Sequence, residues 1–172
     1  AIKIILPSKR TSSAFLQQFE REAKVLANLT HTNIVKVLNY GIQDGQPYLV
    51  MEYVSGGTLR EAMRQKMPWQ TAAAVLAPIA RALDYVHRQQ IVHRDVKPSN
   101  ILLHEDFRPM LSDFGILKLL EDKEEKVDSA IGAGIGTPEY MPPEQGLGKE
   151  VDFRADIYSL GLVFYEMITG QK

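Results

Sequence analysis

Four side chains suited to phosphate chemistry lie in two short segments of the sequence. "HRDVKPSN" carries Asp95, Lys97 and Asn100, and "SDFG" carries Asp113. Asp95 could accept or orient the proton of a hydroxyl group, and Lys97 could offset the charge of a transferring anion. Asn100 and Asp113 supply the hard oxygen ligands that Mg²⁺ prefers. Each residue alone is more often a cap or a solvated charge, so it is their combination that predicts metal-assisted phosphate transfer.

The composition is that of a globular protein with balanced charge. The chain has 172 residues, of which 45% are hydrophobic, and a formal net charge of −1. This is enough for one domain or two small lobes, and the charge gives no reason to expect nucleic-acid binding. The absence of cysteine fits a reducing compartment, so we expect a cytoplasmic location. No apolar run is long enough to cross a bilayer, and a membrane anchor outside these residues is compatible with this expectation.

The N-terminal residues predict a small unit of strands around one helix. Ser12 or Ser13 can cap a helix whose apolar residues recur at helical spacing, and Asp44-Gly45 is a strong hairpin signal. The expected elements are a strand at 1–6, a helix at about 13–29, and strands at 34–40 and 47–53.

The remaining residues predict a mainly helical unit. Gln90 stands where a helix often ends on a left-handed glycine, so its side chain should cost about 1 kcal/mol. The expected elements are a short helix from Thr58 to about Lys66, a long helix at 69–89, brief strands at 101–103 and 110–111, a loop at 121–133 and a last helix at 156–169.

The order of the polar groups resembles the signatures of the eukaryotic-type protein kinases. His93-Arg94-Asp95 with Asn100, and Asp113-Phe114-Gly115, match the patterns H-R-D-L-x-x-x-N and D-F-G, with Val96 in place of the leucine. The resemblance covers essentially the whole chain, and "GTPEYMPPEQ" and "DIYSLGLVFYEMITG" look closest to bacterial members. It implies an α+β, two-lobe protein-kinase-like fold, with a partial N-lobe at 1–54 and a partial C-lobe at 55–172.

The resemblance also implies where ATP would bind. Lys3 in "AIK" resembles the lysine of the V-A-I-K strand, which holds the α- and β-phosphates and pairs with a helix glutamate, here Glu22. Glu20 is the competing choice, and Glu22 is preferred because it shares the helix face of the apolar residues. A lone lysine in an apolar strand is otherwise an edge residue. The implied adenine contacts are Ala1 and Leu102 on the two faces of the base, Met51 as gatekeeper, and the backbone of Glu52, Tyr53 and Val54; plain core packing is the alternative for Ala1 and Leu102.

Control of activity is a further implication. Leu26, Val37, Phe114 and His93 would stack as an apolar column based on Asp156. Arg94 beside Asp95 suggests control by phosphorylation, because an arginine there can pair with a phosphate.

The phosphate in question would sit on the activation segment. Ser129 is the candidate phosphosite and Thr137 a second one, although Ser129 could also be an ordinary loop serine. Lys97 together with Thr137 follows the serine/threonine-kinase pattern, so the implied partners are ATP, Mg²⁺ and proteins that carry serine or threonine. Dimerisation of the full-length kinase is also possible among such relatives.

Two features of the family are missing from these residues. No glycine-rich loop precedes Lys3, and the last helices of the large lobe do not follow "EMITGQK". We therefore expect these 172 residues to be inactive by themselves. The alternatives to a protein kinase are a non-catalytic pseudokinase scaffold and a small-molecule phosphotransferase on a kinase-like fold. Retention of Lys3, Asp95 and Asp113 disfavours the first, and the long segment from Asp113 to "GTPEYMPPEQ" disfavours the second.

Overall fold

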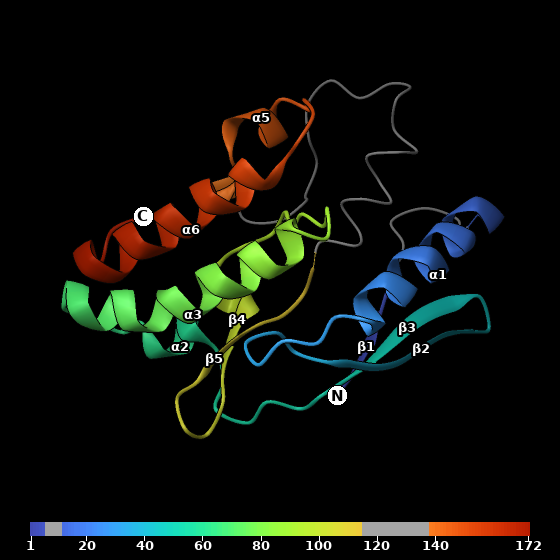
Figure 1. Ribbon diagram of the computed structural model, residues 1–172, viewed down its shortest axis with the longest axis horizontal. Helices are drawn as coiled ribbons and strands as arrows, with labels where there is room; N and C mark the ends of the chain where they lie inside the picture. Colours follow the sequence, from blue (N-terminus) through green and yellow to red (C-terminus); the bar gives the residue numbers. More distant parts are fainter. Residues whose placement is uncertain (6–11, 115–137) are drawn as a thin grey trace.

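A small antiparallel sheet with one helix lies beside a larger, mainly helical part in the computed structural model, which describes residues 1–5, 12–114 and 138–172 (Figure 1). The first part contains β1 (Ile2–Ile4), α1 (Ser13–Ala27), β2 (Val37–Gln43) and β3 (Gln46–Met51). The second contains α2 (Leu59–Ala62), α3 (Trp69–His87), β4 (Ile101–Leu103), β5 (Pro109–Leu111), α5 (Pro143–Gly146), α6 (Phe153–Thr169) and 3-10 helices at Pro98–Asn100 and Pro138–Tyr140.

The three-stranded sheet has the order β1-β3-β2, with all neighbours antiparallel. Asp44 and Gly45 turn the β2-β3 hairpin with φ values of 51° and 76°, which confirms the predicted turn. Strand β2 begins at Val37, so the predicted start at residue 34 is wrong. The preceding residues pair elsewhere, because Val35 N donates to Leu111 O (2.9 Å) in the other sheet.

Helix α1 begins where the sequence predicts. The Ser12 hydroxyl accepts a hydrogen bond from Phe15 N (3.0 Å), the standard contact of an N-cap serine. One face of the helix is buried, and it packs with Val37 and Leu49 of the sheet in one apolar cluster. The buried residues of that face are Phe15, Phe19, Ala23 and Leu26.

The turn after α1 joins the two parts of the structure. Asn33 Nδ2 donates to Pro109 O (2.8 Å), and Arg108 Nη1 donates to Thr32 O (2.7 Å). The Tyr85 hydroxyl of α3 accepts from Thr30 N (3.1 Å). The C-terminal end of α1 is therefore tied to α3 and β5.

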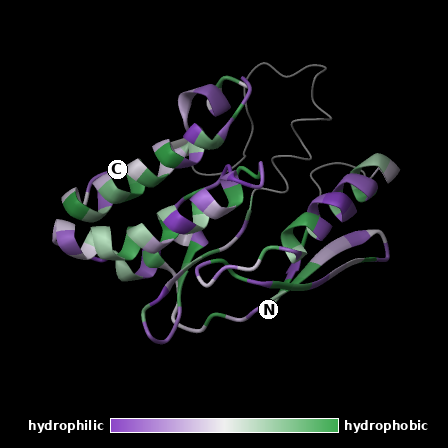
Figure 2. Ribbon diagram, viewed as in Figure 1, coloured by the Kyte–Doolittle hydropathy of each residue, from purple (hydrophilic) through white to green (hydrophobic). Residues whose placement is uncertain are grey.

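Helices α3 and α6 form the centre of the second core, and apolar residues recur along both helices in Figure 2. Two predicted boundaries need correction. Helix α2 stops at Ala62, not near residue 66, because Met67 N donates a hydrogen bond to Met167 O of α6 (2.7 Å). Helix α6 begins at Phe153, before the predicted residue 156, because Asp152 caps it by accepting from Arg154 N (2.9 Å).

Gln90 ends the long helix in the left-handed conformation, as predicted, with φ of 61°. Gln90 N donates to His87 O (2.9 Å), and Ile91 N donates to Val86 O (3.0 Å). These two bonds are the Schellman pattern, in which glycine is the usual residue at the left-handed position.

Replacing Gln90 with glycine should therefore stabilise the protein by about 0.5–1 kcal/mol, because the Cβ penalty of the left-handed region disappears. Urea unfolding measures the change. Gln89→Gly is the matched control, since the left-handed φ belongs to Gln90, and it should give no gain. Equal stabilisation by both variants would contradict the assignment.

Gly56 tolerates no side chain, because an added Cβ would collide with Leu103 O and lie 2.9 Å from His104 O. Gly56→Ala should destabilise the protein by about 1–3 kcal/mol through overpacking against backbone. Gly146→Ala, whose Cβ would meet only Met141 Sδ at 3.7 Å, should leave the melting temperature nearly unchanged. A Gly56→Ala protein as stable as wild type would show that this approach of the backbone is not needed.

Candidate active site

A buried carboxylate on α6 holds the segment that precedes Asp95. Asp156 is only 1% exposed and accepts hydrogen bonds from His93 N (2.8 Å), Arg94 N (2.8 Å) and His87 Nε2 (2.7 Å). Arg94 has a φ of 66°, a conformation that costs a non-glycine residue energy. The bonds to Asp156 hold this strained residue in place and thereby fix the backbone that leads to Asp95.

The carboxylate of Asp95 lies between a cation and an amide. Lys97 Nζ is 2.8 Å from Asp95 Oδ2, and Asn100 Nδ2 donates to both Asp95 Oδ2 (2.8 Å) and Asp95 O (2.8 Å). Pro98 opens the 3-10 helix that carries Asn100, at a position where its missing N–H is not needed. These three predicted residues are thus brought together in one contact group.

Asn100 and Asp113 lie at the same end of the β4-β5 hairpin. Ile101 pairs with Leu111, and Ser112 N donates to Asn100 O (2.9 Å), so Asp113 follows directly on a residue bonded to Asn100. The Asn100 amide nitrogen is committed to Asp95, and no described residue donates to its Oδ1. An amide oxygen and a carboxylate oxygen at one hairpin end fit a magnesium ion.

Phosphate oxygens or water would have to complete such a site. Within residues 1–5, 12–114 and 138–172, no three His, Cys, Asp or Glu side chains gather as a metal cage. Magnesium commonly binds through one or two protein ligands together with substrate phosphates, so this ligand set remains suitable.

Lys3 pairs with Asp113, not with Glu22 as the sequence predicts. Lys3 Nζ is 2.6 Å from Asp113 Oδ1, and the Glu22 Oε1 atom instead accepts from Gln18 Nε2 (2.6 Å). The expected ion pair is therefore absent from this structure, because each partner has another contact. Glu22 is half-buried and Glu20 is exposed, which agrees with the choice of Glu22 as the inward carboxylate.

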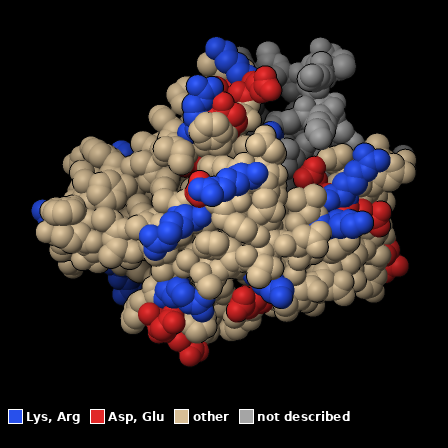
Figure 3. Space-filling model, in the orientation of Figure 1, with Lys and Arg blue, Asp and Glu red and all other residues tan. Residues whose placement is uncertain are grey.

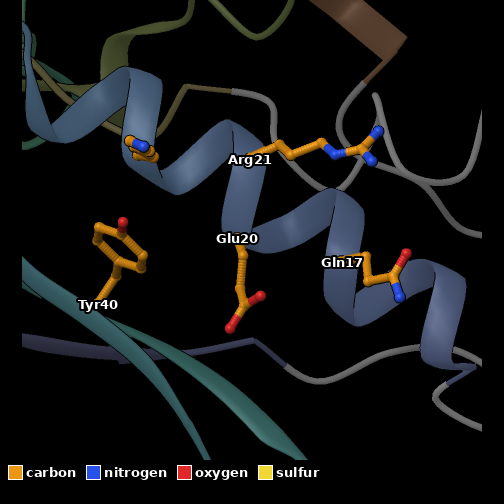
Figure 4. Close-up of a pocket in the computed structure, with 5 residues that line it drawn as sticks. Gln17, Glu20, Arg21 and Tyr40 are labelled. Atoms are coloured by element: carbon orange, nitrogen blue, oxygen red, sulfur yellow. The ribbon is translucent and has the colours of Figure 1, made fainter.

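Glu20 lines a pocket formed by α1 and Tyr40 of β2, and its side chain extends from the helix on the side of Tyr40 (Figure 4). The pocket also involves Gln17, Arg21 and Lys24.

His93 connects Asp95 with the residues next to Asp113. The imidazole is fully buried and lies against the Phe114 ring, with centroids 4.6 Å apart. His93 Nε2 donates to Ser112 O (2.9 Å), and Nδ1 accepts from Asp95 N (3.2 Å), which assigns the neutral ring with hydrogen on Nε2. Burial lowers the pKa of His93, and the negative charge of Asp156 opposes this effect.

Phe114 bridges the two apolar cores. It packs against the cluster that contains Leu26 and Val37, and also against the cluster between α3 and α6. The His93 ring stacks on Phe114, and the His93 backbone N–H donates to Asp156, so Phe114, His93 and Asp156 are linked by direct contacts.

The predicted adenine contacts gather where β1 meets the end of β3. Met51 N donates to Ala1 O (2.8 Å), and Met51 and Leu102 pack against the same small cluster, which includes Val54. Glu52 N donates to Lys36 O (2.9 Å). In the described part of the chain, the N–H groups of Tyr53 and Val54 make no hydrogen bond, so they can bind a ligand. Gly115, Ser129 and Thr137 lie outside the described residues.

One polar cluster was not predicted from the sequence. Arg60 of α2 forms an ion pair with Glu166 of α6 (2.6 Å), and the Tyr140 hydroxyl contacts both. Burial and the neighbouring Glu166 carboxylate raise the pKa of Tyr140 to about 12. The cluster ties the 3-10 helix at Pro138–Tyr140 to α2 and α6, and no spacing in the sequence links these three positions.

The surface of the described residues carries both signs of charge. Figure 3 shows Lys and Arg side chains interspersed with Asp and Glu on the visible face. None of the helices that the structure describes combines the length and apolar character needed to cross a bilayer.

Known proteins with similar sequences are kinases. The family model described as protein kinase domain matches residues 1–172. A probable serine/threonine-protein kinase of Clostridium perfringens, CPE1738, is 39% identical over 172 residues, covering 99% of this chain and 25% of that protein. The serine/threonine-protein kinase PknB of Mycobacterium leprae is 40% identical over 177 residues, covering 99% and 28%. This chain thus spans about a quarter of the length of these curated relatives.

A solved structure has the same fold. The crystal structure of the Mycobacterium tuberculosis PknI kinase domain matches with a TM-score of 0.78 and 33% sequence identity, covering 98% of this chain and 63% of that chain.

The buried, neutral His93 should make stability depend on pH. Because its folded pKa lies below the ordinary value of 6.5, the unfolded chain binds a proton first as the pH falls below about 6.5. The free energy of unfolding should then fall by up to about 1.4 kcal/mol per pH unit from this group. His93→Phe keeps the ring contact with Phe114 but lacks the titrating group.

Urea unfolding between pH 7.5 and 5 checks this. The stability advantage of wild type over His93→Phe should shrink as the pH falls, whereas His104→Phe, at a partly exposed loop histidine, should keep the wild-type pH dependence. A constant difference between wild type and His93→Phe would show that His93 does not contribute.

Proposed function

This chain belongs to the protein kinase family, as a segment of a bacterial-type serine/threonine kinase, and on that premise we propose that it carries the phosphate-transfer site of a protein that phosphorylates serine and threonine hydroxyls with ATP. The observation that carries the proposal is the contact group of Asp95, Lys97 and Asn100 beside the hairpin end that bears Asp113. Four groups with complementary chemistry converge there.

Asp95 is the residue that orients the attacking hydroxyl and accepts its proton. Its Oδ2 atom is held by Lys97 and Asn100, so the carboxylate is oriented before a substrate arrives. A preorganised group of this kind loses little entropy in the transition state. Lys97 also offsets the charge of the phosphate in transfer.

Asn100 and Asp113 would hold Mg²⁺ through Oδ1 of the amide and through the carboxylate. When bound, the ion neutralises charge on the ATP phosphates. Lys3 approaches the same region, since its ammonium lies 2.6 Å from Asp113, and it binds the α- and β-phosphates. Electrostatic stabilisation and positioning, rather than a covalent intermediate, would therefore supply the rate.

The adenine base would bind between Ala1 and Leu102, beside Met51. The backbone N–H groups of Tyr53 and Val54, which donate to no described residue, support this placement, together with the backbone of Glu52. We place the boundary between the two lobes after residue 54, where the chain leaves β3 and continues toward α2.

The proposed control elements are Arg94, which binds a phosphate on Ser129 or Thr137, and the stacked pair His93 and Phe114. A kinase of this kind acts on protein substrates that carry serine or threonine.

The test is transfer of labelled phosphate from ATP with Mg²⁺ to a generic serine/threonine protein, by the natural protein that contains these residues. Asp95→Asn should lower kcat by about 10²–10⁴-fold, because the base is lost while the shape is kept. Asp84→Asn is the matched control, since the Asp84 side chain forms an exposed ion pair with Arg88 on α3, and it should retain full activity.

Two outcomes would contradict the proposal. An Asp95→Asn protein with wild-type kcat would show that Asp95 is not the base. A wild-type protein that binds ATP but transfers phosphate to no protein would favour a pseudokinase or a small-molecule phosphotransferase.

A further inference from the structure

We propose that Gln18 is a positioning residue that holds the Glu22 carboxylate back from Lys3 and so limits assembly of the nucleotide site. The inference rests on the proposed function, because it concerns the lysine that binds the phosphates. The observation behind it is a pair of alternative contacts. Gln18 Nε2 donates to Glu22 Oε1 (2.6 Å), while Lys3 Nζ lies 2.6 Å from Asp113.

The contact between Gln18 and Glu22 belongs to the helix itself. The two residues are one turn apart on α1, where side chains at i and i+4 meet on one face. Both are half-buried, next to the buried Phe19 and Ala23. Gln18 therefore keeps hold of Glu22 wherever α1 moves, without help from any other element.

When nucleotide binds, Lys3 would compete with Gln18 for the Glu22 carboxylate. In the proposed function Asp113 becomes a metal ligand and Lys3 turns to the α- and β-phosphates, so the Lys3 ammonium is released from its ion pair with Asp113 and can take a carboxylate of α1 as a second partner. Helix α1 offers Glu20 and Glu22, and Glu20 is exposed and lines the pocket on the side of Tyr40 (Figure 4). Glu22 is thus the available partner. Its carboxylate must exchange the contact with the Gln18 amide for one with the Lys3 ammonium, or contact both groups at once.

The size of the effect follows from the kind of bond. A hydrogen bond between a glutamine and an acidic side chain at i,i+4 raises the population of the bonded arrangement by about twofold. A contact between an ammonium and a carboxylate is charged on both sides, so it is stronger than the bond from the neutral Gln18 amide to the same carboxylate. Gln18 therefore delays formation of the Lys3 contact but does not prevent it.

The experiment compares Gln18→Met with Gln17→Met in the natural protein. Methionine keeps the length and helix propensity of glutamine but cannot donate a hydrogen bond. Gln17 is the neighbouring residue, it is exposed, and it lines the same pocket as Glu20 (Figure 4). Both variants are studied alone and with Glu22→Gln.

The first readout is the side-chain carboxyl ¹³C resonance of Glu22 without nucleotide, identified by its loss in Glu22→Gln. It should shift in Gln18→Met and not in Gln17→Met. The second readout is the Kd of ATP with Mg²⁺, which should fall about twofold in Gln18→Met and stay unchanged in Gln17→Met. With Glu22→Gln present, the effect of Gln18→Met on Kd should vanish.

An unshifted Glu22 resonance in Gln18→Met, or a Kd that is unchanged or higher, would overturn the inference. Failure of the proposed function looks different, because the protein would then transfer no phosphate while the Glu22 resonance still responded to Gln18→Met.

Discussion

The site depends on one buried charge, the carboxylate of Asp156. A carboxylate that is only 1% exposed must have its oxygens satisfied inside the protein, and here two successive backbone N–H groups and one imidazole do this. Hydrogen bonds to a charged group are worth about 1.5–3 kcal/mol each, which outweighs the strain of Arg94 at a φ of 66°. The backbone before Asp95 therefore takes a conformation that it would not choose alone.

The same network continues from Asp156 to Asn100 and to Ser112, the residue before Asp113. His93, whose N–H is bonded to Asp156, donates from its ring to Ser112 O, and Ser112 donates from N and Oγ to Asn100 O. Asn100 in turn donates to Asp95. The segment that carries Asp95 and the strand end that leads to Asp113 are thus parts of one closed set of hydrogen bonds. A closed and buried set is rigid, which is what electrostatic preorganisation requires.

Much of this arrangement could be predicted from local signals. Ser12, the Asp44-Gly45 turn and Gln90 each act through the backbone within a few residues, so their effects are visible in the sequence. The chemistry of Asp95, Asn100 and Asp113 was also accessible, because their order matches a known signature. The ion-pair partner of Lys3 could not be predicted in this way. Both Glu22 and Asp113 are candidate partners, and their spacing in the sequence does not decide between them. The Arg60, Tyr140 and Glu166 cluster was missed because its members come from three distant segments.

Burial separates the contacts that can exchange from those that cannot. Lys3 and Asp113 are 37% and 33% exposed, so water screens their ion pair and it contributes little to stability. The bond from Gln18 to Glu22 joins a neutral amide to a half-buried carboxylate and is also weak. Loss of either contact leaves groups that water can solvate, whereas loss of a bond to Asp156 leaves a buried group unpaired. Ligand binding can therefore rearrange the side chains of Lys3 and Glu22 at low cost while Asp95 and Asn100 stay in place. The adjustable side of the site thus lies on β1 and α1, and the fixed side lies on the segment anchored to α6.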